Sequence, residues 1–383
     1  MRFKRSARAT VAAAVLALVA AGCGGGSDGG TGGTNLAGCK IQLGFFGALT
    51  GDNANLGINI QQGAQLAIEQ YNAKHQDNCV GLKKYDSAGV PEQAPPLARA
   101  AVGDKTVLGI IGPAFSGESN VANPTFDKGG LPIITASATN PILGQKGFKT
   151  FHRILGNDAI QGVAVAKYIK GTMKAQKVFV VDDATDYGKG LATIVKGDLG
   201  SAVVGTDTVQ QKQTDFSATV TKIRASGATA FYYGGYYAEA GKLRKQLTDA
   251  GGKAITMVAS DGVRDPGFVK GAGQAAAEGT ILTCPCLPGS KTTGNFAADY
   301  EKRWGVESGT YSPEAFDAAN VFLQGIAAGK TTRPALNDFI GSYSGAGVTK
   351  MIQFDDKGEV TEKVIWAYTV KAGKIVEDQE IKQ

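Results

Sequence analysis

The stretch PIITASATNPIL, residues 132–143, begins as an apolar strand and ends in small hydroxyl residues. Thr135, Ser137 and Thr139 stand at alternate positions just before an Asn-Pro pair. Such residues are frequent in turns because their side chains hydrogen-bond the local backbone. Hydroxyl groups can also bind a polar ligand that has been withdrawn from water. From these residues alone, both the turn and the ligand site stay open.

Residue patterns typical of enzymes are missing from the sequence. The first strand is not followed by Gly-x-Gly-x-x-Gly, no Walker lysine loop occurs, and Ser116 in GPAFSGES lacks the Gly-x-Ser-x-Gly spacing of a nucleophile elbow. The two histidines, His75 and His152, have no nucleophile beside them, and Cys-Pro-Cys at 284–286 lacks the ligand spacing of a zinc site. The sequence therefore predicts no enzyme, no cofactor and no metal site.

Strand-like and helix-like segments alternate through most of the chain. The expected strands are 40–46, 79–86, 107–112, 131–135, 177–183, 202–209, 230–235 and 255–260. The expected helices are 58–74, 91–102, 119–129, 161–173, 188–199, 216–227 and 238–251. Ile60, Ala64, Ala67, Ile68 and Tyr71 share one face of the first helix. This alternation predicts an α/β fold with parallel sheets that are covered by helices on both faces.

The alternation ends after residue 286, where two longer helices are expected at 295–305 and 313–329. Two β-rich segments follow, 352–360 and 363–376, and each contains a hairpin-type turn, DDKG or KAGK. About 345 residues exceed the size at which one hydrophobic core keeps growing, so two Rossmann-like lobes joined by a multi-strand hinge are expected. Ligands of open parallel sheets bind beyond the carboxyl ends of the strands, which predicts a cleft between the lobes.

The N-terminal residues have the composition of an export signal. Four cations precede the apolar run VAAAVLALVAAG, which ends in small residues before Cys23. The ending LVAAGC is similar to a bacterial lipobox, with Ala20 where leucine is commoner, and a Gly-rich tether follows. We expect a signal peptide at 1–22, a lipidated Cys23 and a tether at 23–37. The alternative is a plain cleaved secretory signal.

Charge and cysteine content narrow the possible partners. Processing at Cys23 removes four cations and no acids, so the formal charge falls from +6 to about +2, which argues against a nucleic-acid partner. Four cysteines remain, Cys39, Cys79, Cys284 and Cys286, and an even number in an exported protein favours disulfides. No second apolar run approaches a membrane-spanning length.

Six segments, taken together and in order, resemble the periplasmic-type branched-chain amino-acid binding proteins of ABC transporters, which have the type I periplasmic binding protein fold. They are LGFFGALTGDNANLGINIQQGAQLAIEQYN, IIGPAFSGES, PIITASATNPILGQKGFKTFHRILGNDAIQGVAVAKYI, VDDATDYGKGL, FYYGGYYAEAGKLRKQLTDAG and ASDGV. The resemblance covers nearly all of the chain after the tether. It implies a first lobe at 38–155 plus 285–355 and a second lobe at 156–284 plus 356–383, which close on a free amino acid.

The resemblance implies roles for several residues of this chain. Ser116 matches the residue whose hydroxyl and amide bind the ligand carboxylate, and Ser137, Ala138 and Thr139 match the segment that holds both the carboxylate and the ammonium. A carboxylate withdrawn from water needs several charge-assisted donors, and a helix that starts after Ser116 would offer backbone N–H groups.

Three residues of the second lobe match positions that cover the ligand. Tyr187 and Tyr236 are the aromatic ones, for which ordinary packing is the alternative. Asp261 matches the acid that pairs with the ammonium, although the compared family member has Glu there and an Asp before Gly is otherwise a turn residue.

Ligand selectivity is implied to depend on Leu56, Phe115 and Tyr311. Leu56 replaces an aromatic residue, Phe115 a small one, and Tyr311 adds a hydroxyl. No further acid or base stands at the matched positions of the side-chain end. We expect leucine, isoleucine or valine as the ligand, with phenylalanine, alanine or a small amide as the fallback.

The positions of the cysteines predict one disulfide and leave another open. Cys39 and Cys79 come just before the first two expected strands, which lie side by side in this fold class, so their Cα atoms are expected within bridging range. Cys284 and Cys286 are two apart on an expected strand, where a small ring is possible.

The expected partners are the amino acid, an ABC transporter permease and the membrane through the lipid anchor, with the protein as a monomer on the outer face of the cell membrane. Two other hypotheses stay open. One is a sensory or regulatory receptor of the same fold for an amide or another small polar ligand. The other is a lipoprotein hydrolase with an unrecognised site.

Overall fold

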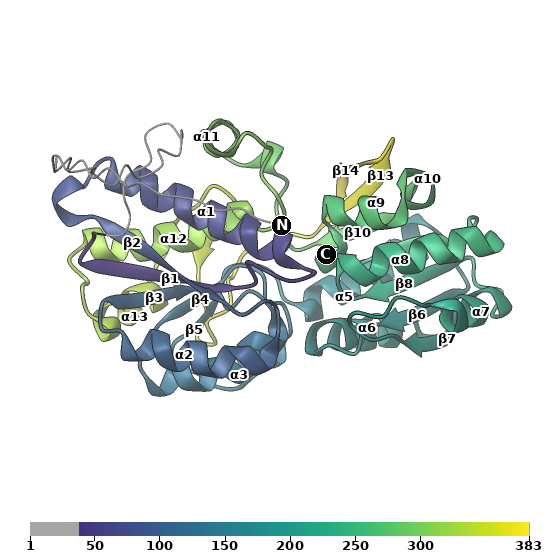
Figure 1. Cartoon of the computed structure of the whole chain (residues 1–383), viewed down its shortest axis with the longest axis horizontal. Coiled ribbons are helices and arrows are strands. Elements are labelled where there is room, and N and C mark those ends of the chain that lie inside the picture. Colours follow the sequence, from purple (N-terminus) through teal and green to yellow (C-terminus); the bar gives the residue numbers. More distant parts are fainter. Residues whose placement is uncertain (1–37, 383) are drawn as a thin grey trace, which may run out of the picture. The chain divides into compact units, whose positions relative to one another are not determined.

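A computed structural model describes residues 38–382 (Figure 1), so the expected signal peptide, Cys23 and the whole of the expected tether lie outside the described residues. The first sheet has five parallel strands in the order β2-β1-β3-β4-β5. Their bounds are β1 Ile41–Gly47, β2 Val80–Asp86, β3 Val107–Ile111, β4 Ile133–Thr135 and β5 Phe151–Arg153.

Helices cover both faces of this sheet because its strands alternate their buried side chains. Phe45 packs in the core beneath α1 (Ala54–Asn72) and α12 (Ser312–Ala327), and its neighbour Phe46 packs in the core beneath α2 (Ala94–Gly103) and α3 (Ser116–Lys128). Figure 1 shows the two helix layers on opposite faces. The first sheet is therefore buried on both sides, as the apolar strands predict.

The helix α1 has the apolar face that the sequence predicts. Ile60, Ala64, Ala67 and Ile68 are buried, whereas Tyr71 is half-buried and stacks on His75. Gly63 lets α1 approach α12 closely, since a Cβ atom there would lie 2.1 Å from the Ser312 carbonyl oxygen.

The second sheet has seven strands in the order β14-β13-β10-β9-β8-β6-β7. The parallel strands are β6 Val178–Asp182, β7 Val203–Thr208, β8 Ala230–Gly234, β9 Thr256–Ala259 and β10 Ile281–Cys284. The antiparallel hairpin β13 Trp366–Lys371 and β14 Lys374–Glu380 extends the sheet beyond β10. The turn KAGK therefore forms the predicted hairpin.

Helices also lie on both faces of the second sheet (Figure 1). They are α5 Asp158–Lys167, α6 Asp186–Leu199, α7 Ser217–Ala225, α8 Tyr237–Leu247, α9 Pro266–Ala272 and α10 Gln274–Ala277. Three further helices are α4 Ile142–Gln145, α11 Phe296–Trp304 and α13 Arg333–Gly341. The α/β fold with two parallel-sheet lobes is confirmed. The predicted lobe boundaries fall between elements of the two sheets and stay a prediction.

The segment around DDKG differs from the expectation of a longer antiparallel region. Phe354 and Val360 form only an isolated bridge across the turn. The preceding strand β12 (Met351–Gln353) instead pairs with β11 (Ser344–Ala346) in a small separate sheet. The sequence pattern around DDKG predicted the turn but not the partner of the strand.

Both cysteine pairs form disulfides. Cys39 and Cys79, just before β1 and β2, have their Cα atoms 5.3 Å apart, and Cys284 and Cys286 have theirs 5.0 Å apart. The expectation that the second pair shares a strand is wrong, because β10 ends at Cys284. No helix within residues 38–382 has both the length and the apolarity that a membrane crossing requires.

Candidate functional site

A pocket lies where the carboxyl ends of strands from both sheets meet. Loops after β3, β4, β8 and β9 contribute to it, together with the start of α1, α6 and α12. Its lining consists of Leu56, Ala114, Phe115, Ser116, Ser137, Tyr187, Tyr236, Asp261 and Tyr311. Eight of the ten predicted ligand-binding residues are thus brought together. Ala114 was not predicted, and the ligand-binding role of each residue stays a prediction.

Two hydroxyls and a helix N-terminus form one end of the pocket. Ser116 is the first residue of α3, and its Oγ accepts a hydrogen bond from the Asn140 amide at 3.2 Å. The Ser137 hydroxyl donates to the Ala114 carbonyl at 2.6 Å. The Ser116 hydroxyl therefore keeps its own proton for a further acceptor, next to the positive end of a helix dipole.

Ala138 and Thr139, the other two predicted residues, do not line the pocket. The Ala138 carbonyl accepts a hydrogen bond from Arg153 Nη1 at 2.9 Å, and so does the Asn140 carbonyl. Arg153 is fully buried and paired with Glu359, whose Oε2 lies 2.9 Å from its Nε. Arg153, held in place by Glu359, therefore fixes the backbone of residues 138–140.

Asp261, which follows β9 of the second sheet, is the acid in the pocket lining. Its carboxylate is 1% exposed and accepts hydrogen bonds from the Tyr187 hydroxyl at 2.5 Å, from Gln161 Nε2 at 2.8 Å and from the Tyr311 hydroxyl. Burial raises the pKa of Asp261, and these donors oppose the rise. Gln161 was missed by sequence reasoning, because nothing local marks a helix glutamine as the partner of an acid 100 residues away.

Aromatic rings line much of the rest of the pocket. The Phe115 and Tyr236 ring centroids are 5.0 Å apart, and those of Tyr187 and Tyr236 are 5.2 Å apart. The cavity left between the side chains has a volume of only about 10 Å³, which is about the room that one water molecule needs. An amino acid can therefore enter only if side chains move or the two sheets separate.

Hydrogen bonds also join elements of the two predicted lobes next to residues of the pocket lining. Asn55 of α1 donates to Asp265 at 2.9 Å. Asn120 of α3 donates to the Asp186 carboxylate at 2.9 Å, and Asn140 donates to the Asp186 carbonyl at 2.6 Å. These contacts hold the pocket closed around Asp261.

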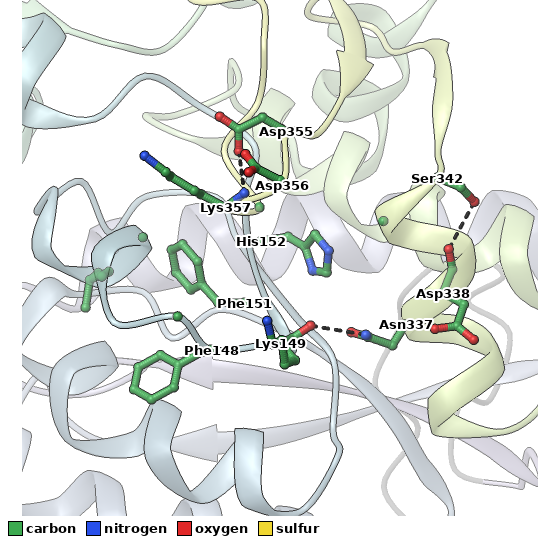
Figure 2. Close-up of a pocket in the computed structure, with 15 residues that line it drawn as sticks. Phe148, Lys149, Phe151, His152, Asn337, Asp338, Ser342, Asp355, Asp356 and Lys357 are labelled. Atoms are coloured by element: carbon green, nitrogen blue, oxygen red, sulfur yellow. Dashed lines mark hydrogen bonds between the residues drawn. The ribbon is translucent and has the colours of Figure 1, made fainter.

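A different pocket of about 420 Å³ contains His152 (Figure 2) and none of the predicted ligand-binding residues. His152 is 4% exposed, and burial lowers its pKa to about 4, so the ring is neutral at pH 7. Ser342 and Asp338 line the same pocket, but the Ser342 hydroxyl donates to the backbone carbonyls of Asp338 and Phe339. Within the described residues no hydrogen bond joins Ser342 to His152, so no activated nucleophile is formed there.

Two lobes that present the ends of parallel strands to a shared polar pocket define a ligand-binding site. The chain belongs to the periplasmic binding protein family, whose model matches residues 40–374. Proteins of this family bind ligands outside the cytoplasm. This match confirms the family that the sequence resembles, and with it the expectation that the protein is not an enzyme.

The chain is similar to several branched-chain amino-acid binding proteins. It is 30% identical over 349 residues to the Leu/Ile/Val-binding protein BraC3 of Rhizobium johnstonii. The aligned region covers 89% of this chain and 94% of BraC3. It is 34% identical over 250 residues to the Leu/Ile/Val-binding protein of Escherichia coli, and the alignment covers 64% of this chain and 67% of that protein. The crystal structure of LivJ from Streptococcus pneumoniae in complex with isoleucine superposes with a TM-score of 0.83 at 26% identity, with 89% and 98% covered.

Proposed function

We propose that this protein binds an α-amino acid with an uncharged side chain, in the first place leucine, isoleucine or valine, and delivers it to an ABC transporter permease. The observation that carries the proposal is that one buried acid, Asp261 after β9 of the second sheet, lines the same small pocket as Ser116, the first residue of α3 after β3 of the first sheet. The names of the relatives support the branched-chain ligands.

The charges of the pocket match a zwitterion. A carboxylate at the Ser116 end would accept from hydroxyl and backbone N–H donors and would be stabilised by the helix dipole of α3. An ammonium at the other end would donate to Asp261. The lining contains no second charged side chain that would pair with a charged ligand side chain.

The side-chain end supports a compact ligand. Leu56, Phe115, Tyr236 and Tyr311 are all buried there and offer mainly apolar surface. Branched aliphatic side chains suit such a surface. If the rings do not withdraw, the small residual cavity favours alanine or a small amide instead, and a rotated ring would accept phenylalanine.

A thermal-shift screen against the twenty amino acids and small amides tests the proposed ligand class. A ligand at 100 times its dissociation constant should raise the free energy of unfolding by about 2.7 kcal/mol, which gives a clear rise in the melting temperature. Arginine and glutamate serve as controls with charged side chains and should have no effect. A response to amides without any response to an amino acid would point to the receptor for a small polar ligand.

We also propose that the protein is a monomeric lipoprotein whose lobes, 38–155 plus 285–355 and 156–284 plus 356–383, close on the ligand at the outer face of the membrane. Cys23, the lipidation site, lies outside the described residues. Support comes from the lipobox-like LVAAGC and the Gly-rich stretch before the folded residues.

Substitution of the lipidation site provides a separate test. The Cys23→Ala variant is expected to leave the membrane fraction or to stay unprocessed, because the lipid anchor is lost while the folded residues are unchanged. Fractionation of cells followed by immunoblotting measures the effect, and a Ser27→Ala variant controls for changes near the tether. Equal membrane association of the Cys23→Ala variant and the wild type would contradict the anchor.

A further inference from the structure

We propose that Asp158 is a second acid that helps to bind the ammonium group of the ligand. It acts indirectly, through its neighbours Thr139 and Asp261, and it releases a proton to solvent when the ammonium binds beside Asp261. This inference rests on the proposed amino-acid ligand. Asp158 lines no part of the pocket, so it is a positioning residue and does not touch the ligand.

Asp158 is the first residue of α5, but its carboxyl group does not cap the helix. Asn157 caps α5 by accepting a hydrogen bond from the Ala159 amide at 3.1 Å. The Asp158 side chain is 0% exposed, and neither of its carboxyl oxygens has a hydrogen-bond partner among residues 38–382. A fully buried acid without a partner costs free energy, so its presence calls for a function.

The surroundings connect Asp158 to the ligand pocket. The Asp158 backbone amide donates to the Thr139 carbonyl at 2.9 Å. The Thr139 hydroxyl is near the Asp158 carboxyl group and favours its charged form, although the two side chains are not aligned for a hydrogen bond. Gln161, one turn further along α5, donates to Asp261 at 2.8 Å. Thr139 Oγ and Gln161 Oε1 are also buried without a partner in the described part of the chain. Unused polar atoms thus surround the two acids.

The groups that face Asp158 leave it without a cation of its own. Arg153 is the nearby cation, but its guanidinium pairs with Glu359 and donates to two backbone carbonyls. The other titratable group that acts on Asp158 is Asp261. Asp158 in turn helps to raise the pKa values of four buried tyrosines, Tyr187, Tyr232, Tyr236 and Tyr311, which are uncharged at neutral pH.

One of the two acids must therefore be neutral in the ligand-free protein. Asp261 accepts hydrogen bonds from three donors, whereas the Asp158 oxygens accept none from the described residues, so the negative charge is better stabilised on Asp261. Burial and the Asp261 carboxylate also raise the pKa of Asp158, and Asp158 is therefore the protonated member of the pair. An ammonium beside Asp261 adds a positive charge that stabilises the Asp158 carboxylate. Only the O–H bond of Asp158 then breaks, its proton goes to solvent, and the ligand keeps its three ammonium protons.

The sign of the resulting pH dependence follows from this proton balance. Because binding releases a proton, the affinity rises as the pH increases, by up to tenfold per pH unit for one proton released. Between pH 5 and 7 a free α-carboxyl and an α-amino group keep nearly constant charge. A proton released in this range therefore comes from the protein.

Titration calorimetry with leucine at pH 6, in two buffers with different enthalpies of ionisation, counts the protons. We expect the wild type to release a substantial fraction of one proton per leucine and the Asp158→Asn variant to lose that release. Glu118 and Asp183, whose buried carboxyls have pKa values raised to about 7, contribute equally to both proteins and cancel in the difference. The exposed Asp338→Asn variant is the matched control and should keep the wild-type count.

The infrared difference spectrum of the wild type provides a measurement that needs no variant. With ¹³C-labelled aspartate, leucine should remove the carbonyl stretch of a protonated aspartic acid. Leucine binding without proton release, or an unchanged release in Asp158→Asn, would overturn the role of Asp158 and leave the proposed function intact. If leucine fails, the same titration uses whichever amino acid raises the melting temperature. Failure of all twenty would overturn the proposed function and this inference with it.

Discussion

The Asp261→Ala variant is expected to bind its amino acid at least tenfold more weakly than the wild type. Asp261 is the single acid in the pocket lining, and it is buried with donors from both lobes. Removing one partner of a desolvated charge pair typically costs about 2 to 5 kcal/mol of binding free energy. The ammonium of the ligand would then lack a counter-charge in direct contact, since Asp158 does not line the pocket. Titration calorimetry on both proteins measures the loss.

Two comparisons make this result specific. Asp356→Ala removes an exposed acid in the pocket of Figure 2 and should leave the affinity unchanged. Asp261→Asn keeps a hydrogen-bond acceptor for Tyr187 but removes the charge, so it separates the ionic contribution from the loss of packing. Wild-type affinity in Asp261→Ala, or a preferred ligand that lacks an ammonium, would show that the assigned polarity of the pocket is wrong.

The Arg153→Met variant is expected to lose about 3 to 5 kcal/mol of the free energy of unfolding, the cost typical of breaking a buried ion pair from one side. Glu359 would keep a poorly solvated charge, and the carbonyls of Ala138 and Asn140 would lose their donor. The segment that carries Ser137 would then be less firmly held, so weaker ligand binding should accompany the loss. Urea unfolding followed by circular dichroism gives the change in stability.

Lys245→Met provides the control for the removal of a cation. Lys245, near the end of α8, pairs at 2.7 Å with Asp249, just beyond the end of this helix, and both side chains are more than half exposed. Exposed pairs contribute about 0 to 1 kcal/mol, so this variant should unfold close to the wild-type midpoint. Equal destabilisation by both substitutions would mean that the buried position of Arg153 has no special role.

The sequence predicted the sheets and the pocket lining well because both depend on local patterns. Apolar runs alternating with amphipathic helices are sufficient to indicate parallel sheets. Hydroxyls after a strand, such as Ser137, and an acid after another, such as Asp261, lie near a shared edge once the sheets exist. The resemblance then suggested which of these residues belong together.

The residues behind the pocket could not be predicted in the same way. Arg153 and Glu359 are 206 positions apart, and no periodicity connects a three-residue strand with a distant turn. Asp158 has the sequence context of an ordinary helix start, and only its burial distinguishes it. The small volume of the cavity depends on the rotamers of four aromatic rings, which composition does not determine.

The disulfide between Cys39 and Cys79 also determines how the folded part responds to mechanical force. Any pull on the chain ahead of Cys39 reaches the starts of β1 and β2 together, because the two cysteines precede these neighbouring parallel strands. The hydrogen bonds between β1 and β2 are then not sheared against each other, and the tension passes to the pairing of β1 with β3. The bond therefore spreads tension over two strands at the point where the chain enters the fold, so that β1 cannot be drawn out of the sheet alone.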